Sequence, residues 1–127
     1  MRTLFVFILM YFIIPTNEII PNYSSLVINK KDAQKLAEYY RQRVIRGESM
    51  SSITKLYSED NGSAINGGLY NNVVPGMMVP EFDKVAFNLK PNEISEVFQT
   101  QFGFHFIQLI SRKGNSICFR HLLITKD

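Results

Sequence analysis

The chain has 127 residues, of which 46% are hydrophobic and 20% are charged, as is typical of a folded domain. This length predicts one domain with tails, which is large enough to bury a core without disulfides. A net charge of +3 from dispersed basic residues argues against nucleic-acid binding. Because Cys118 is the single cysteine and His105 and His121 are the only histidines, we expect no internal disulfide and no metal site.

The amino terminus differs from the rest of the chain. An unbroken apolar run at residues 4–14 follows Arg2 and ends at Pro15. It is too short to span a bilayer as a helix, but it fits the apolar core of a secretion signal. We therefore expect residues 1–20 to be a signal peptide or a membrane anchor, which places the protein in the periplasm or cell envelope. A buried strand or helix, or a wrongly chosen start codon, is the alternative.

The first half of the remaining chain predicts a strand and two helices. Residues 23–28 resemble a short strand. A helix should follow and end near Gly47, because apolar residues recur at spacings of three and four. These residues are Ala33, Leu36, Ala37, Tyr40 and Val44. A second helix is predicted at residues 51–57.

The second half predicts a long loop, one helix and a sheet. Residues 58–76 carry several Gly-containing turn pairs and are expected to form an irregular, functional loop. Pro80 should open a helix, since proline is favoured at the first helical position. Strands are predicted at residues 94–100, 104–111 and 117–124. On 104–111, even-numbered residues should share one face and odd-numbered ones the other. The result is an α+β domain with helices packed on an antiparallel sheet.

Three blocks of sequence together resemble the parvulin (PpiC, rotamase) family of peptidyl-prolyl cis–trans isomerases. They are Leu-Tyr-Ser-Glu-Asp-Asn-Gly-Ser-Ala with Asn-Gly-Gly at 56–68, Gly-Met-Met-Val-Pro-Glu-Phe at 76–82, and Glu-Ile-Ser through Thr-Gln-Phe-Gly-Phe-His at 93–105. They occur in family order and spacing across residues 22–112. The resemblance implies a parvulin/FKBP-like fold, a four-stranded antiparallel sheet wrapped by helices, with a proline-binding cleft.

The resemblance also implies a set of site residues. Met78 and Phe82 would form the apolar floor that receives the proline ring, and Tyr70 would form a wall. Asp60 matches the acidic or thiol position beside the isomerising bond, and Thr100 and His105 match the polar residues behind it. Each has a structural alternative: core packing for Met78 and Phe82, a turn for Asp60, and a hydrogen-bonded structural role for His105.

The sequence departs from the family at the first strand. Ser25 stands where family members usually carry a histidine, and residues 69–73 lack the usual acidic residue and Gly-aromatic pair. The missing pattern, Phe-Arg-His-Leu-Leu-Ile, occurs instead at 119–124 and contains His121. In SurA-type chaperones parvulin domains stand in tandem, so residues 114–127 are an extra strand that would begin a second domain after the isomerase domain at 21–113. Alternatively, this strand folds back beside 104–111 and returns a histidine to the site.

The predicted function is isomerisation of Xaa-Pro bonds in unfolded or exported proteins, with folding-chaperone character. An Xaa-Pro bond rotates without bond cleavage, so no cofactor is expected. The partner is an extended polypeptide, with no nucleic acid, and with a membrane only through the amino-terminal segment. One alternative is a peptide-holding module that lost catalysis with Ser25. A restored histidine would favour the enzyme, and Ser25 alone would favour the holding module. A third interpretation is a spacer domain without a binding site. The presence of Met78 and Phe82 beside a glycine-rich loop argues against it.

Overall fold

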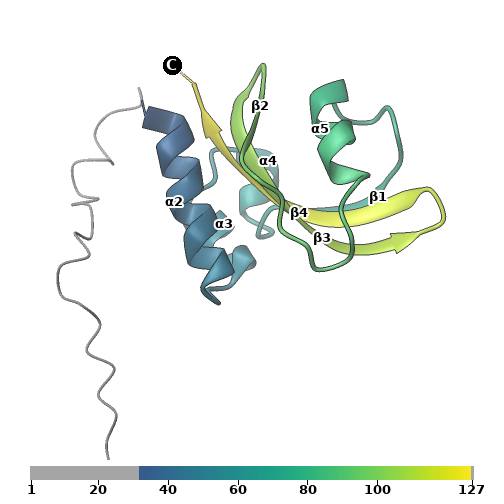
Figure 1. Cartoon of the computed structure of the whole chain (residues 1–127), viewed down its shortest axis with the longest axis horizontal. Coiled ribbons are helices and arrows are strands. Elements are labelled where there is room, and N and C mark those ends of the chain that lie inside the picture. The colour runs from purple at the N-terminus through teal and green to yellow at the C-terminus, as the bar shows by residue number, and fades with distance from the viewer. Residues whose placement is uncertain (1–31, 127) are drawn as a thin grey trace, which may run out of the picture.

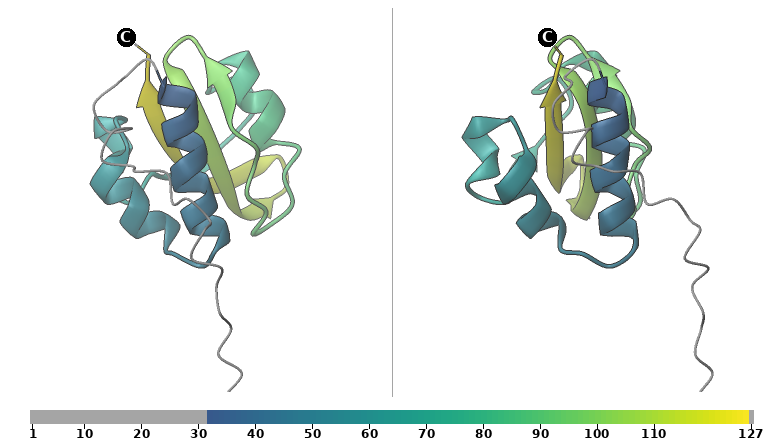
Figure 2. Two further views of the ribbon diagram at one scale, coloured as in Figure 1. Left: turned by 60° about the vertical axis from the view of Figure 1, so that its left-hand side comes forward. Right: turned by 90° about the vertical axis from the view of Figure 1, so that its left-hand side faces the viewer.

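The computed structural model describes residues 32–126. Its elements are α2 (Ala33–Ile45), α3 (Met50–Tyr57), α4 (Asn61–Ala64), β1 (Leu69–Val73), α5 (Pro80–Ala86), β2 (Phe98–Thr100), β3 (Gly103–Lys113) and β4 (Ser116–Thr125). The four strands form one antiparallel sheet in the order β1-β4-β3-β2. In Figures 1 and 2, α2 and α3 lie on one side of this sheet and α5 lies on the other. The α+β prediction is confirmed.

The three predicted helices are present at nearly the predicted positions. Ser49 caps α3 by accepting a hydrogen bond from the backbone of Ser52, and α5 begins at Pro80. At the end of α2, Gly47 takes a φ of +111°, a left-handed conformation that glycine adopts without strain. The predicted strand at 23–28, Ser25 and the proposed signal or anchor at 1–20 all lie outside the described residues.

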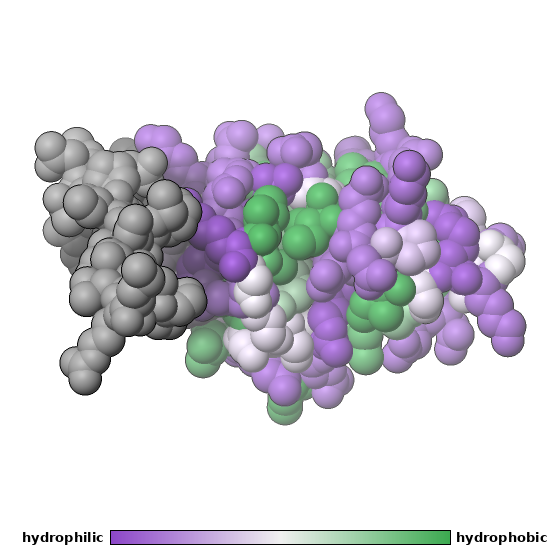
Figure 3. All heavy atoms as spheres, turned by 60° about the horizontal axis from the view of Figure 1, so that its bottom comes forward, coloured by the Kyte–Doolittle hydropathy of each residue, from purple (hydrophilic) through white to green (hydrophobic). Residues whose placement is uncertain are grey.

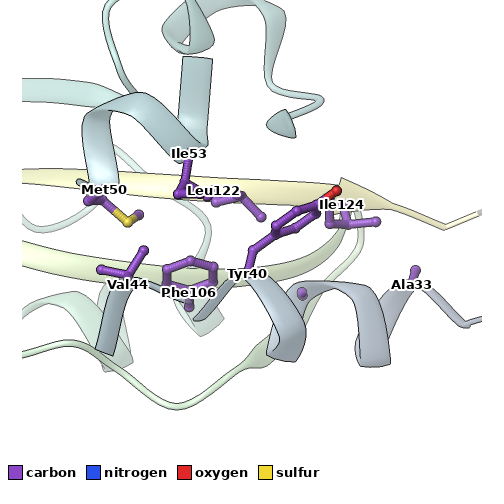
Figure 4. Close-up of a cluster of buried hydrophobic side chains, with 9 residues drawn as sticks. Ala33, Tyr40, Val44, Met50, Ile53, Phe106, Leu122 and Ile124 are labelled. Atoms are coloured by element: carbon purple, nitrogen blue, oxygen red, sulfur yellow. The ribbon is translucent and has the colours of Figure 1, made fainter. Parts of the chain in front are cut away.

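One apolar core lies between the sheet and the pair α2 and α3. Tyr40 and Val44 of α2 and Ile53 of α3 pack against Phe106 of β3 and Leu122 of β4 (Figure 4). Phe106 and Leu122 are fully buried. A second core lies under α5 on the other face of the sheet, formed by Val73, Phe82, Ala86, Leu89, Ile107, Leu109, Ile117 and Phe119. The predicted alternation is confirmed from Phe104 to Leu109, with even-numbered residues toward α2 and odd-numbered residues toward α5, and an irregularity between Leu109 and Ser111 ends it.

The prediction of an irregular loop at residues 58–76 is wrong in part, because the segment contains α4 and β1. Residues Leu69–Val73 carry two asparagines and little β-branched sequence, so propensity alone does not reveal the strand. It forms because Tyr70 pairs with Phe119 of β4. Gly68 precedes it with a φ of +73°, and a side chain there would collide with the carbonyl oxygen of His121. This glycine lets β1 approach β4 at the histidine.

The strand predicted at residues 94–100 is shorter than expected. Only Phe98–Thr100 pairs continuously with β3, while Ile94 makes a single bridge to Gln108. Between them, the carbonyl oxygen of Ser95 accepts a hydrogen bond of 2.6 Å from Arg41 Nε of α2. The Ser95 hydroxyl also accepts a hydrogen bond from the backbone of Ile107. These side-chain bonds replace part of the strand ladder.

The last strand, β4, is an inner strand of the sheet. It folds back through the turn at Gly114 and pairs along its length with β3, so that His121 lies opposite Ile107. Its other edge pairs with β1 and is extended by Glu59, whose amide bonds to the carbonyl of Leu123. A boundary after residue 113 would thus divide two neighbouring strands of one sheet. The observed pairing is the folding-back arrangement.

The surface of the domain is largely hydrophilic on the face shown in Figure 3, where apolar side chains form separate groups. Scattered apolar groups are normal on a folded domain. Within residues 32–126, no helix has the length and apolar character needed to cross a bilayer.

Candidate active site

The candidate site lies on the α5 face of the sheet, where β3 and β4 each contribute one buried histidine. His105 follows the same alternation as Ile107, and His121 the same alternation as Phe119, so both rings point toward α5. The two imidazoles stack with their centroids 5.6 Å apart and their planes at 20°. Their Nδ1 atoms are 3.4 Å apart. Each histidine is only 3% exposed.

A chain of hydrogen bonds runs through both histidines. Thr100 Oγ1 lies 2.6 Å from His105 Nε2, and His121 Nε2 lies 2.8 Å from Asp60 Oδ2. The backbone amide of Phe102 donates to Thr100 Oγ1 over 3.1 Å. Each group is satisfied when Thr100 donates to His105, His105 donates through Nδ1 to His121, and His121 donates to Asp60. The chain links the β2–β3 turn to α4 across the sheet.

Asp60 is the end of this chain and accepts two further hydrogen bonds. Ser63 Oγ donates to its Oδ2 over 2.6 Å, and the Tyr70 hydroxyl donates to the same oxygen over 2.9 Å. The hydrogen bond from His121, reinforced by those from Ser63 and Tyr70, holds the pKa of Asp60 well below its usual range. Asp60 therefore remains ionised at neutral pH.

The environment keeps His105 and Tyr70 uncharged. Burial, together with repulsion from His121, lowers the pKa of His105 to about 4. Burial and the neighbouring Asp60 carboxylate raise the pKa of Tyr70 above its usual value. At neutral pH the site thus contains one carboxylate, a neutral imidazole at His105 and a protonated phenol.

A pocket of about 330 Å³ opens beside these polar groups. It is lined by Asp60, Tyr70, Met77, Met78, Val79, Phe82, Phe102, His105 and His121. Phe82, from α5, is 1% exposed and meets both histidine rings edge-on, at 5.6 Å from His105 and 5.4 Å from His121. The pocket therefore has a polar end at Asp60 and an apolar end formed by Met78, Val79 and Phe82.

All six predicted catalytic and substrate-binding residues gather here, although the sequence predicted no contacts among them. Asp60, Tyr70, Met78, Phe82 and His105 line the pocket, and Thr100 lies behind His105. His121, whose role the sequence left open between a second domain and the site, also lines it. Sequence reasoning missed four residues: Ser63, Met77, Val79 and Phe102. Ser63 lies within the first block of the family resemblance, but the short helix α4 that brings it to Asp60 is not predicted by the sequence.

Nucleophilic catalysis by a serine or a cysteine does not fit this geometry. In a Ser-His-Asp hydrolase the serine and the carboxylate bind different ring nitrogens of the histidine. Here Ser63 Oγ, at 3.4 Å, and Asp60 both approach Nε2 of His121. Cys118 lies on the opposite face of β4 and donates to Asn71. In the described part of the chain, no three His, Cys, Asp or Glu side chains are grouped so as to hold a metal ion.

A second hollow, of about 560 Å³, lies on the other side of Met78. Its two ionisable side chains are Asp83 and Lys84. Asp83 Oδ2 accepts a hydrogen bond from the amide of Gly76, which fixes the loop before α5. Because this hollow lacks the hydrogen-bonded chain of titratable groups, the smaller pocket is the candidate active site.

Comparison with known proteins points to one family. The model of the rotamase family, described as the PPIC-type PPIASE domain, matches residues 17–111. Chaperone SurA of Nitrosococcus oceani is 38% identical over 89 residues, which cover 70% of this chain and 21% of that protein. Chaperone SurA of Pseudomonas aeruginosa is 37% identical over 90 residues, which cover 71% of this chain and 22% of that protein. The chain thus spans about a fifth of the length of these relatives.

A solved structure supports the fold. The crystal structure of the peptidylprolyl isomerase PrsA from Bacillus cereus matches with a TM-score of 0.51 and 24% identity, covering 80% of this chain and 41% of that one. At this identity the likeness concerns the fold alone.

Proposed function

Because this chain belongs to the PPIC-type (parvulin) rotamase family, we propose that it catalyses cis–trans isomerisation of Xaa-Pro bonds in extended segments of unfolded or exported proteins. The observation that carries the proposal is the placement of an apolar pocket directly against a chain of buried polar groups. The pocket is about 330 Å³ and combines Met78 and Phe82 with Asp60, His105 and His121.

The reaction needs binding and electrostatics and no bond cleavage. Resonance gives the amide C–N bond partial double-bond character, with a rotation barrier of roughly 18–20 kcal/mol. An enzyme lowers this barrier by binding the twisted amide better than either planar form. Met78 and Phe82 would hold the proline ring, because a thioether and an aromatic ring form an adaptable apolar surface. Asp60 and the two histidines would supply a fixed electrostatic environment beside the rotating bond.

The alternative of a holding module without catalysis is less well supported. It rested on Ser25 replacing the histidine of the first strand. His121, from β4, lies 2.8 Å from Asp60 and stacks on His105, which supports the enzyme. Chaperone character follows from the same groove, because a surface that binds Xaa-Pro in an extended chain also holds unfolded polypeptide. The SurA relatives, named as chaperones, support this part.

Location is proposed from the amino terminus. The apolar run at residues 4–14 fits a secretion signal or anchor, and we propose that the protein acts in the periplasm or cell envelope. Fusing residues 1–31 to a reporter that is active only after export tests this. Reporter activity that persists after two lysines are placed within the run would contradict the proposal.

The function is tested by isomerisation of a short Xaa-Pro peptide by the purified chain, beside Met78→Ala and Leu56→Ala. Leu56 is an exposed leucine of α3, 70% exposed, and is a matched apolar truncation outside the pocket. We expect Met78→Ala to lower kcat/KM at least tenfold, because burying such a side chain against substrate contributes about 1.5–3 kcal/mol. Leu56→Ala should leave it unchanged. Peptide binding without acceleration would favour the holding module.

A further inference from the structure

Three hydrogen-bond donors converge on one oxygen atom in the candidate active site. Asp60 Oδ2 accepts from Ser63 Oγ at 2.6 Å, from His121 Nε2 at 2.8 Å and from the Tyr70 hydroxyl at 2.9 Å. A carboxylate oxygen offers about two lone-pair sites, so three donors exceed its capacity. The bond from Tyr70 is the longest of the three, and its loss would leave Asp60 with two charge-assisted partners.

Of these donors, only Tyr70 is both half-buried and part of the pocket wall. Ser63 is 3% exposed and does not line the pocket, and His121 is held between Asp60 and His105. Tyr70 comes from β1, and its ring stacks on Phe119 at 5.4 Å and 17°. The same ring meets His121 edge-on at 5.3 Å. The ring is therefore fixed, while its hydroxyl can rotate toward a molecule in the pocket.

The reacting bond creates a new acceptor during the reaction. In a planar Xaa-Pro amide the nitrogen lone pair is delocalised into the carbonyl group. As the bond twists, the lone pair localises on nitrogen, which then accepts a hydrogen bond. A neutral donor placed there stabilises the twisted amide and does nothing for either planar form, which is the condition for raising kcat.

We propose that Tyr70 is a catalytic residue whose hydroxyl exchanges its hydrogen bond from Asp60 to the proline nitrogen of the substrate as the amide twists. This inference rests on the proposed function and gives Tyr70 a role beyond that of a pocket wall. No proton is transferred and no covalent bond forms or breaks. The raised pKa of the Tyr70 phenol supports this role, because the hydroxyl keeps its proton at neutral pH.

The test compares Tyr70→Phe with Ser63→Ala in steady-state isomerisation of one Xaa-Pro peptide. Tyr70→Phe keeps the ring and its stacking on Phe119, and Ser63→Ala removes the other neutral donor to Asp60. We expect Tyr70→Phe to lower kcat roughly five- to tenfold, the effect of one hydrogen bond, with KM within about twofold of wild type. Ser63→Ala also takes a donor from Asp60, so it measures any effect that passes through Asp60, and it should lower kcat clearly less than Tyr70→Phe does. Placing 3-fluorotyrosine at position 70, which retains the hydroxyl, should restore most of kcat.

Three results would overturn the inference alone, provided that the wild type accelerates the reaction and that Met78→Ala lowers kcat/KM at least tenfold. These are an unchanged kcat in Tyr70→Phe, a loss confined to KM, and an equal loss of kcat in Ser63→Ala. The second would make Tyr70 a wall only, and the third would mean that the effect passes through Asp60. A wild type that accelerates no peptide would instead overturn the proposed function together with this inference. Circular dichroism and unfolding midpoints confirm that each variant is folded.

Discussion

The two faces of the sheet are built from the same two strands but carry different chemistry. Toward α2 and α3, Phe106 of β3 and Leu122 of β4 enter an apolar core and are 0% exposed. Toward α5, His105 and His121 of the same strands enter a polar chain that ends at Asp60. Strand alternation separates the two sets, since neighbouring residues point to opposite faces.

Because of this difference, the two faces should contribute differently to stability and to catalysis. Apolar burial on the α2 side contributes the same stability from acid to neutral pH, because none of the side chains in this core ionises in that range. On the α5 side, buried polar groups are stabilising only while each keeps its hydrogen-bond partner and its protonation state. Mutations on the first face should therefore change the free energy of unfolding without changing catalysis. Mutations on the α5 face should change how both the free energy of unfolding and the catalytic activity depend on pH.

The largest effect on stability is expected at the apolar face. Phe106→Ala removes a fully buried ring from the core under α2 and should lower the free energy of unfolding by about 3–5 kcal/mol. Urea denaturation measures the loss. Catalytic activity per folded molecule should stay at the wild-type level, because Phe106 points away from the pocket. A loss of activity in a stably folded Phe106→Leu variant would contradict the separation of the two faces.

The apolar pattern predicted more of this architecture than the polar residues did. The helical spacing of apolar residues such as Tyr40 and Val44 was sufficient to place α2. The alternation around Phe106 was sufficient to assign the two faces of β3. By contrast, β1 has two adjacent asparagines, and it is a strand only because β4 lies beside it. Local propensity cannot supply such long-range pairing.

The site was predicted as a set of residues from the family resemblance, and its connections were not. Asp60 and His105 were expected near the reacting bond, but the contact between Asp60 and His121 spans 61 positions and depends on where β4 lies. The sequence allowed β4 either to begin another domain or to fold back, so His121 remained open. Ser63 was missed because a serine in a glycine-rich loop predicts a turn before it predicts a hydrogen bond to a carboxylate.

The contribution of the polar face to the free energy of unfolding should begin to fall in mild acid. The pKa of His105 is lowered by burial from 6.5 to about 4, so the unfolded chain binds more protons than the folded one between these values. Stability from this residue is thus complete above pH 6.5 and is lost as pH falls toward 4, by up to about 3 kcal/mol. His105→Gln should remove this part of the slope. Urea unfolding at several pH values measures it, and equal slopes in both proteins would contradict a buried, neutral His105.

Protonation of Asp60 should also lower the free energy of unfolding as the pH falls. The loss should be smaller than that from His105 and should occur at a lower pH. Its pKa is depressed in the folded state, so its contribution is present above the ordinary carboxyl value of 3.8 and is lost as pH falls below it. The side chain is 24% exposed, so solvent screens part of the interaction, and we expect Asp60→Asn to cost about 1–2 kcal/mol at neutral pH.

Acid unfolding separates this contribution from general protonation of carboxylates. Glu81→Gln, at an exposed position of α5, is the matched control and should unfold in acid like the wild type. The difference in unfolding free energy between wild type and Asp60→Asn should be constant from pH 5 to 7 and shrink below the carboxyl pKa of 3.8. A difference that persists unchanged to pH 2 would mean that Asp60 acts by shape and not by charge. In that case the hydrogen bond from His121 would not depend on a carboxylate, and the electrostatic contrast between the two faces would be lost.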